Sequence, residues 1–143
     1  MDVLGDRDVA VDAGPLIYWF ENHDTWAPVL EPLFTAAERT ERPLAASELV
    51  LLEVLTGPLG AGDRVLAARL ENALRHGPWL DLLPISRSVL VRAAELRARY
   101  RVKTPDALHL ATALLRGCGA FVTNDRRIPE IEGLQIVRLK DLL

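Results

Sequence analysis

Four carboxylates lie where a folded domain would not ordinarily place a lone acid. Asp12 closes the apolar run VAVD, Glu53 interrupts SELVLLEVL, Asp106 opens TPDALHLATALL, and Asp125 ends AFVTND. Converging carboxylates repel one another by about 4 kcal/mol per pair at an effective dielectric constant of about 20, so three or four of them together need a cation. An all-oxygen ligand set favours Mg²⁺ or Mn²⁺ over zinc or copper. A water on such a metal has a lowered pKa and can attack a phosphodiester.

Taken singly, the four acids differ in how strongly they point to function. Glu53 lies in an apolar helical segment, so it needs a cation or a hydrogen-bond partner; an arginine salt bridge or a helix edge that reaches solvent would serve equally well. Asp106 is expected in the first turn of a helix, where the helix dipole favours an acid. Asp12 and Asp125 follow expected strands, where aspartate is common in turns. The hypothesis therefore depends on convergence.

Other catalytic chemistries find less support in the sequence. His23, His76 and His109 have no second histidine or cysteine at zinc-ligand spacing, and His109 is interpreted as a packed or surface helix residue. The chain has no GxSxG, Walker or GxGxxG motif, which argues against serine-nucleophile and nucleotide-triphosphate enzymes.

Length and composition indicate one domain spanning residues 1–143. The 143 residues are 50% hydrophobic, and their net charge of −3 provides no overall basic surface for nucleic acid. Cys118 is the single cysteine, which excludes an intrachain disulfide and fits a reducing compartment. No segment approaches the ~20 uninterrupted apolar residues of a membrane span. We expect a cytoplasmic protein with no membrane partner.

Turn, cap and periodicity signals predict strands that alternate with helices. The expected strands are 8–12, 43–46, 79–85, 120–123 and 133–139, and the expected helices are 15–22, 25–41, 48–56, 62–76, 87–101 and 105–116. The expected helix caps are Ser47, Ser86 and Thr104, and the expected stops are Gly57-Pro58, Gly77-Pro78 and Gly117 or Gly119. The expected inward residues are Leu66, Leu70, Ala73 and Leu74 in one helix and Val89, Ala93, Leu96 and Tyr100 in another.

This alternation favours an α/β protein with three layers, α/β/α, around a short, mostly parallel sheet of four or five strands. Functional residues in such sheets gather beyond the carboxyl ends of the strands. Asp12 and Asp125 are both expected at such ends, and Glu53 and Asp106 lie on helices that can border the same rim.

The chain resembles the PIN-domain ribonucleases over nearly its whole length, and its compact size is similar to that of a VapC-type toxin of a bacterial toxin–antitoxin pair. VDAGPLIYWFE, SELVLLEVL, TPDALHLATAL and FVTNDRRIPEIEGLQIVRL carry the resemblance, and the last two segments are the most specific. The resemblance implies a PIN-like fold and a Mg²⁺- or Mn²⁺-dependent endoribonuclease that leaves a 5′-phosphate and a 3′-hydroxyl. It also implies a small antitoxin partner and a homodimer.

Site residues follow from the same match, position by position. Asp12, Glu53, Asp106 and Asp125 would be the catalytic, metal-binding acids, with Thr123 as the supporting hydroxyl. Asn124 is interpreted as a turn-former that gives polar support, with metal ligation as the alternative. Ala13-Gly14 stands where the family commonly has Ser or Thr, so that hydrogen bond is missing or comes from backbone N–H groups.

Basic residues near the proposed site are candidates for RNA contacts. Arg97, Arg99, Arg101 and Lys103 precede Asp106, and Arg126 and Arg127 follow Asp125. Arg126 and Arg127 are the preferred ligands for RNA phosphates.

Two alternative functions of the chain stay open. One is a catalytically silent PIN-like module that binds RNA or protein, which metal titration would distinguish. The other is a phosphoryl-accepting receiver domain, which would need an acidic pair after the first strand.

Overall fold

The computed structural model describes residues 4–39 and 42–143. Five parallel strands form one sheet in the order β3-β2-β1-β4-β5, so the α/β expectation is confirmed and the sheet is entirely parallel. The strands are β1 (Val9–Val11), β2 (Leu44–Ser47), β3 (Leu80–Leu83), β4 (Ala120–Thr123) and β5 (Gln135–Arg138).

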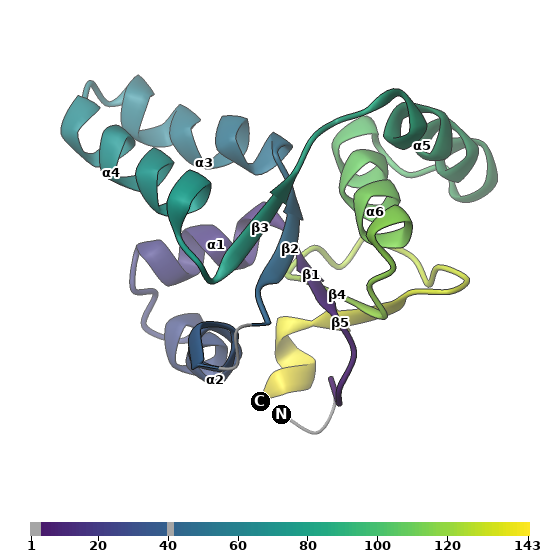
Figure 1. Ribbon diagram of the computed structural model, residues 1–143, viewed down its shortest axis with the longest axis horizontal. Helices are drawn as coiled ribbons and strands as arrows, with labels where there is room; N and C mark the ends of the chain where they lie inside the picture. Colours follow the sequence, from purple (N-terminus) through teal and green to yellow (C-terminus); the bar gives the residue numbers. More distant parts are fainter. Residues whose placement is uncertain (1–3, 40–41) are drawn as a thin grey trace.

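Helices cover both faces of the sheet, as the three-layer expectation requires. They are α1 (Ala13–Phe20), α2 (Trp26–Arg39), α3 (Leu49–Gly60), α4 (Arg64–His76), α5 (Arg87–Tyr100) and α6 (Thr104–Arg116), followed by the short 3₁₀ helix η1 (Leu139–Leu142). Figure 1 shows α1 to α4 on the left of the sheet and α5 and α6 on the right. None of the helices within the described residues is long and apolar enough to cross a membrane.

The two cores follow from the alternation of side chains along each strand. Val9 and Val11 of β1 face the core under α1 to α4, whereas Ala10 faces the core under α5 and α6. Phe121 of β4 joins Ala10 on the second face, between Ala120 and Val122 on the first. Because both faces are buried, the strands contain few polar residues, which explains their short apolar runs.

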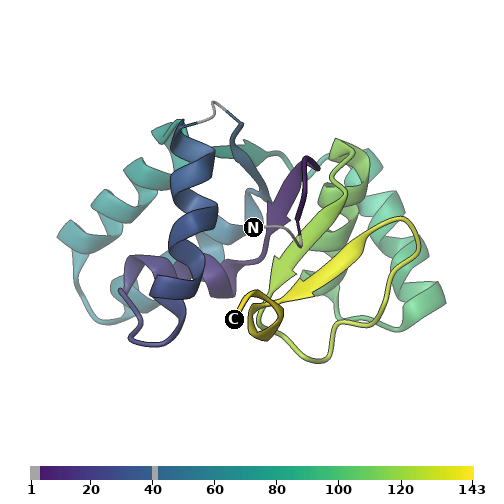
Figure 2. The ribbon, with the colours of Figure 1, turned by 90° about the horizontal axis from the view of Figure 1, so that it is seen from below.

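The strand order places a topological switch point between β1 and β4. The chain extends from β1 to β2 and β3 on one side, and from β4 to β5 on the other. Figure 2 shows β1, β4 and β5 side by side. Val11 pairs with Val122, so Asp12, which follows β1, and Thr123, the last residue of β4, lie together at the same edge of the sheet. Open α/β sheets commonly bind their ligands at this position.

Most expected helix boundaries agree with the structure, and three details are corrected. Gly57-Pro58 does not end α3, which continues to Gly60. Ser47 ends β2, and its Oγ accepts a hydrogen bond from Leu49 N, while Glu48 occupies the cap position. Thr104 is the first residue of α6 rather than its cap, and Lys103 precedes it. The expected end of the second helix at Glu41 lies outside the described residues.

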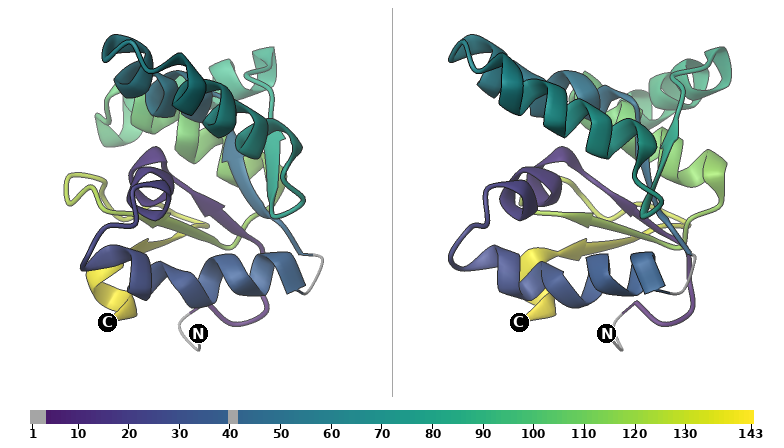
Figure 3. Two further views of the ribbon diagram at one scale, coloured as in Figure 1. Left: turned by 90° about the vertical axis from the view of Figure 1, so that its left-hand side faces the viewer. Right: turned by 60° about the vertical axis from the view of Figure 1, so that its left-hand side comes forward.

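Helices α3 and α4 form an antiparallel hairpin that extends over one end of the molecule (Figure 3). Asp63 caps α4 through a hydrogen bond from Leu66 N to its side chain. Leu66 was expected to face inward, but it is exposed, and Ala67 is the buried residue of that turn. In α5 the expected residues Val89, Ala93 and Leu96 are buried, Tyr100 is partly buried against the same core, and Ser86 caps the helix.

Candidate metal centre

Asp12 and Thr123 join the two strand ends at the switch point. Asp12 N donates to Val122 O (3.0 Å), which continues the pairing of β1 with β4 by one residue. One carboxylate oxygen, Oδ1, accepts a bond from Ala13 N (2.8 Å), and the other, Oδ2, accepts from Thr123 Oγ1 (2.8 Å). A backbone N–H and the threonine hydroxyl therefore orient Asp12, without a hydroxyl at position 13 or 14.

Thr123 connects Asp12 with Asp125. Its side chain is fully buried, and its Oγ1 accepts a hydrogen bond from Asp125 N (3.0 Å) while it donates to Asp12. One hydroxyl thus uses its donor and an acceptor at the same time, which fixes the geometry of two acids on adjacent loops.

Asp125 is held by the residue two positions later. Arg127 donates to Asp125 Oδ1 from both N (2.9 Å) and Nε (3.1 Å), and to Oδ2 from Nη2 (3.1 Å). The hydrogen bonds from the Arg127 side chain are the main cause that lowers the pKa of Asp125; burial opposes them, and the charge of Lys103 adds to the lowering. Asp125 is therefore a carboxylate over the physiological pH range.

Asp106 has the opposite electrostatic environment. It lies in the first turn of α6, half-buried, and burial is the largest cause that raises its pKa. The charges of Asp12 and Asp125 raise the pKa further, and His109 and Arg127 offset part of this effect. The three aspartates are therefore close enough to repel one another, although they come from three separate elements.

Glu53 meets a partner that the sequence analysis missed. It lies on α3 beside the buried residues Val50 and Val54, and its Oε1 is 2.5 Å from Nε2 of His109 on α6. The expected need for a partner is met by histidine and not by arginine. His109 lies three residues after Asp106, a spacing that puts both on one face of the helix, and this was the signal available in the sequence.

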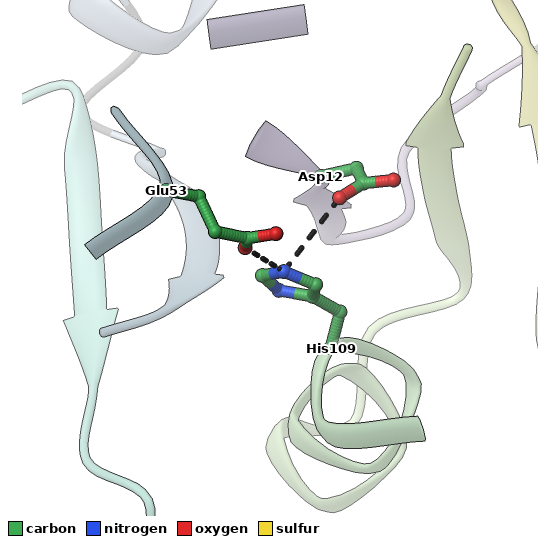
Figure 4. Close-up of side chains that lie close together, drawn as sticks. All are labelled: Asp12, Glu53 and His109. Carbon is green, nitrogen blue, oxygen red and sulfur yellow. Dashed lines mark hydrogen bonds and ion pairs between the residues drawn. The ribbon is translucent and has the colours of Figure 1, made fainter. Parts of the chain in front are cut away.

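The imidazole of His109 is almost fully buried, and it lies against the carboxylates of Glu53 and Asp12 (Figure 4). Burial lowers the pKa of His109, but the hydrogen bond with Glu53 and the charges of Asp12, Glu53 and Asp106 outweigh it, so the pKa lies above its usual value. Asp12 Oδ1 is 3.6 Å from the same Nε2 atom.

The four expected acids surround one cavity of about 410 Å³. Besides them, its lining consists of Ala13, Gly14, Ile17, Lys103, Pro105 and Arg127. Within the described part of the chain, the lining has four acids and two basic side chains, and one of these, Arg127, is already paired with Asp125. Burial is the largest cause that raises the pKa of Asp106, and the charges of Asp12 and Asp125 raise it further. An oxygen-rich donor set with uncompensated charge fits a hard divalent cation, which Asp12, Glu53, Asp106 and Asp125 could hold.

The other site residues expected from the sequence differ in whether they reach the cavity. Asn124 Nδ2 donates to the hydroxyl of Tyr18 (2.9 Å), so its amide supports the α1 side of the site. Of the two expected phosphate ligands, Arg127 lines the cavity, whereas Arg126 is exposed and absent from the described lining. Lys103 is the basic residue before Asp106 that reaches the cavity; Arg99 instead pairs with Glu132.

The PIN domain family model matches residues 9–134. The chain belongs to the PIN-domain family. The match contains all four acids of the cavity together with Thr123 and His109. No curated protein matches the sequence significantly.

Three solved structures are similar to this chain in fold. A chain of a toxin–antitoxin complex from Klebsiella pneumoniae is 23% identical, with a TM-score of 0.63 and coverage of 89% of this chain and 94% of that chain. A chain of VapBC2 from Rickettsia felis, bound to a promoter DNA fragment, is 18% identical, with a TM-score of 0.69 and coverage of 91% and 97%. A chain of DNA-bound VapBC from Salmonella typhimurium is 19% identical, with a TM-score of 0.71 and coverage of 93% and 98%.

Proposed function

We propose that this single PIN domain is a Mg²⁺- or Mn²⁺-dependent endoribonuclease and the VapC-type toxin of a toxin–antitoxin pair. The observation that carries the proposal is the cavity at the switch point, where four carboxylates gather and the pKa of Asp106 is raised by burial and by its acidic neighbours. Such an arrangement destabilises the metal-free protein, and a function that requires a cation accounts for it.

Each residue at the cavity has a defined role in the proposal. Asp12, Asp106 and Asp125 hold the cation with Glu53, and Thr123 keeps two of these acids in place. The bound cation would lower the pKa of a water and stabilise charge on the phosphodiester. Lys103 and Arg127 lie on the cavity lining, where they can contact the phosphates of an RNA strand. Hydrolysis forms a bond from water oxygen to phosphorus and breaks the bond to the 3′-oxygen, which takes up a proton.

RNA cleavage in the presence of Mg²⁺, Mn²⁺ or EDTA tests the activity. We expect cleavage with Mg²⁺ or Mn²⁺ and none with EDTA, and we expect the products to carry a 5′-phosphate, so that a 5′-phosphate-dependent exonuclease degrades them. RNA binding without cleavage under any metal condition would instead identify a catalytically silent PIN-like module.

Arg127 and Arg126 form a matched pair for testing the RNA contact. We expect Arg127→Ala to weaken binding of single-stranded RNA and to reduce the slope of log affinity against log salt by about 0.7, the value for one phosphate contact. Arg126→Ala removes the same charge one residue away, outside the cavity lining, and should leave the slope nearly unchanged. Fluorescence anisotropy with the inactive Asp106→Asn background measures both variants without cleavage. Equal effects of the two variants would remove Arg127 from the phosphate site.

A protein partner is supported by two exposed apolar surfaces. One lies on α3 and α4 (Leu52, Leu59, Val65 and Leu66), and the other on α5 and α6 (Leu90, Val91 and Leu115). We assign the α3–α4 surface to the antitoxin, because α3 also carries Glu53 and a partner bound there can block the cavity. The solved relatives, which are toxin–antitoxin complexes, support such a partner.

We also propose that two copies of this chain form a homodimer. Light scattering that gives a monomer at high protein concentration would contradict the homodimer.

The product of the neighbouring reading frame tests the antitoxin assignment. We expect a small DNA-binding protein that copurifies with this chain and suppresses its RNase activity. Leu52→Glu should weaken this complex at least about tenfold, since a buried charge replaces an apolar contact. Leu90→Glu on the α5–α6 surface is the control and should retain the complex. The reverse pattern in a pull-down would place the antitoxin on α5 and α6.

A further inference from the structure

His109 lies next to two acids of the cavity, Glu53 and Asp12, and the proposed function assigns it no role. Its side chain is 1% exposed, compared with 13% for Asp12 and 29% for Glu53. Nε2 lies 2.5 Å from Glu53 Oε1 and 3.6 Å from Asp12 Oδ1 (Figure 4). Both carboxylates line the cavity, whereas the imidazole is absent from its described lining.

The surroundings of the ring determine which nitrogen carries a proton. Nε2 faces two carboxylate oxygens, which accept hydrogen bonds and cannot donate them when ionised. Nδ1 is buried and, within the described residues, has no hydrogen-bond partner. A proton on Nε2 therefore provides the donor for the hydrogen bond to Glu53 Oε1. If the ring were protonated only on Nδ1, the lone pair of Nε2 would face the carboxylate oxygen and repel it.

We propose that His109 is a positioning residue that holds Glu53 at the metal centre through Nε2–H. This inference rests on the proposed metal-dependent function, because it assigns His109 to the support of a metal ligand. Metal-binding carboxylates are commonly fixed by such outer hydrogen bonds, and loss of the partner typically weakens metal binding about 10- to 100-fold.

Glu53 needs this support more than the three aspartates do. The carboxylate of Asp12 accepts hydrogen bonds from Ala13 N and Thr123 Oγ1, and that of Asp125 accepts hydrogen bonds from Arg127. Within the described residues, the Glu53 carboxylate has its hydrogen bond with His109. A glutamate side chain also has more rotamer freedom to lose. Without His109, repulsion from Asp12 would turn Glu53 away from the cavity toward solvent.

Direct metal ligation by His109 is the competing role. Nε2 and the carboxylate oxygens of Asp12 and Glu53 lie within 4.8 Å of one another, so the three residues could share an ion. The ring, however, is absent from the described lining of the cavity and its Nε2 is engaged with Glu53. The geometry therefore favours support of Glu53 over contact with the cation.

Mn²⁺ binding to the full chain without RNA tests the role, with electron paramagnetic resonance as the readout. We expect His109→Leu to weaken Mn²⁺ binding about 10- to 100-fold. His109→Gln places an amide N–H near the position of Nε2 and should restore most of the affinity. Thr112→Val changes a buried polar residue one turn later on α6, whose hydroxyl bonds to Leu108 O, and should bind Mn²⁺ like the unchanged chain.

A double-mutant cycle shows whether His109 acts through Glu53. In a Glu53→Gln background, His109→Leu should have little further effect on Mn²⁺ affinity, because the residue it supports has lost its charge. Additive losses would overturn the positioning role. Pulsed electron paramagnetic resonance of bound Mn²⁺ should show no directly coordinated nitrogen, and a strong nitrogen coupling that disappears in His109→Leu would instead make His109 a ligand.

Nitrogen NMR of the metal-free chain separates this inference from the proposed function. We expect a protonated Nε2 on His109 whose resonance shifts in Glu53→Gln and stays unchanged in Thr112→Val. An Nε2 without a proton would overturn the positioning role even if the chain binds Mn²⁺ and cleaves RNA. A chain with the expected NMR signals but no Mn²⁺ binding would overturn the proposed function and, with it, the metal-supporting role of His109.

Discussion

Asp106→Asn is expected to lower the RNA cleavage rate by more than about 100-fold. Loss of a residue that only supports a metal ligand typically costs up to about 100-fold, and loss of a ligand itself should cost more. Asn keeps the size of the side chain and removes the charge that holds the cation. The same substitution should raise the Tm of the metal-free protein at neutral pH. The raised pKa of Asp106 means that its ionisation costs folding free energy, chiefly because of burial and then because of the charges of Asp12 and Asp125.

The stability gain from Asp106→Asn should depend on pH. The ionised Asp106 penalises folding at pH values above its raised pKa, and protonation relieves this penalty as the pH falls through that pKa. The Tm difference between the variant and the unchanged chain should therefore shrink on acidification. Asp24→Asn, at an exposed aspartate outside the cavity lining, is the control and should change neither the RNA cleavage rate nor the Tm. Full RNase activity in Asp106→Asn would contradict the assignment.

Thr123→Val should damage both stability and activity, because one buried hydroxyl serves two acids. Val is similar in shape but leaves Asp125 N without its acceptor and Asp12 Oδ2 without its donor. Each buried group left without a partner costs about 1–3 kcal/mol, and loss of outer support at a metal site costs about 10- to 100-fold in activity. Chemical denaturation and single-turnover cleavage measure the two effects.

Thr123→Ser is the matched control for this prediction. Serine keeps the hydroxyl and removes only a methyl group, so it should retain most of the activity and lose less stability than Thr123→Val. If Thr123→Val cleaves RNA as fast as Thr123→Ser or faster, the hydroxyl is not needed for activity, and the support of Asp12 and Asp125 by Thr123 would be wrong.

The convergence of Asp12 and Asp125 depends on a property that sequence patterns describe only in part. Short apolar runs that end in an acid placed both residues at strand ends, and the structure has β1 and β4 ending at Val11 and Thr123. That these two strands are neighbours follows from the strand order, which periodicity does not determine. The resemblance to PIN domains supplied the missing step, since it implied that all four acids share one site.

The deviations from the sequence-based expectations have local physical causes. Pro58 was expected to stop α3, yet Ala61 N still bonds to Gly57 O, so the helix gains a last turn beyond the proline. Proline removes one N–H donor, which costs least near an exposed helix end. The spacing from Asp106 indicates only that His109 shares its helix face, because the partner of His109, Glu53, lies 56 residues away in the chain.

The most direct test of the central claim compares metal binding with metal-dependent catalysis. The single-turnover rate of RNA cleavage is measured against free Mn²⁺ concentration, and Mn²⁺ affinity is measured by direct titration of the same protein. If the four acids hold the catalytic cation, the two midpoints should coincide, and Asp106→Asn should abolish binding and cleavage together. Cleavage that persists in EDTA, or in a variant that no longer binds Mn²⁺, would contradict the account.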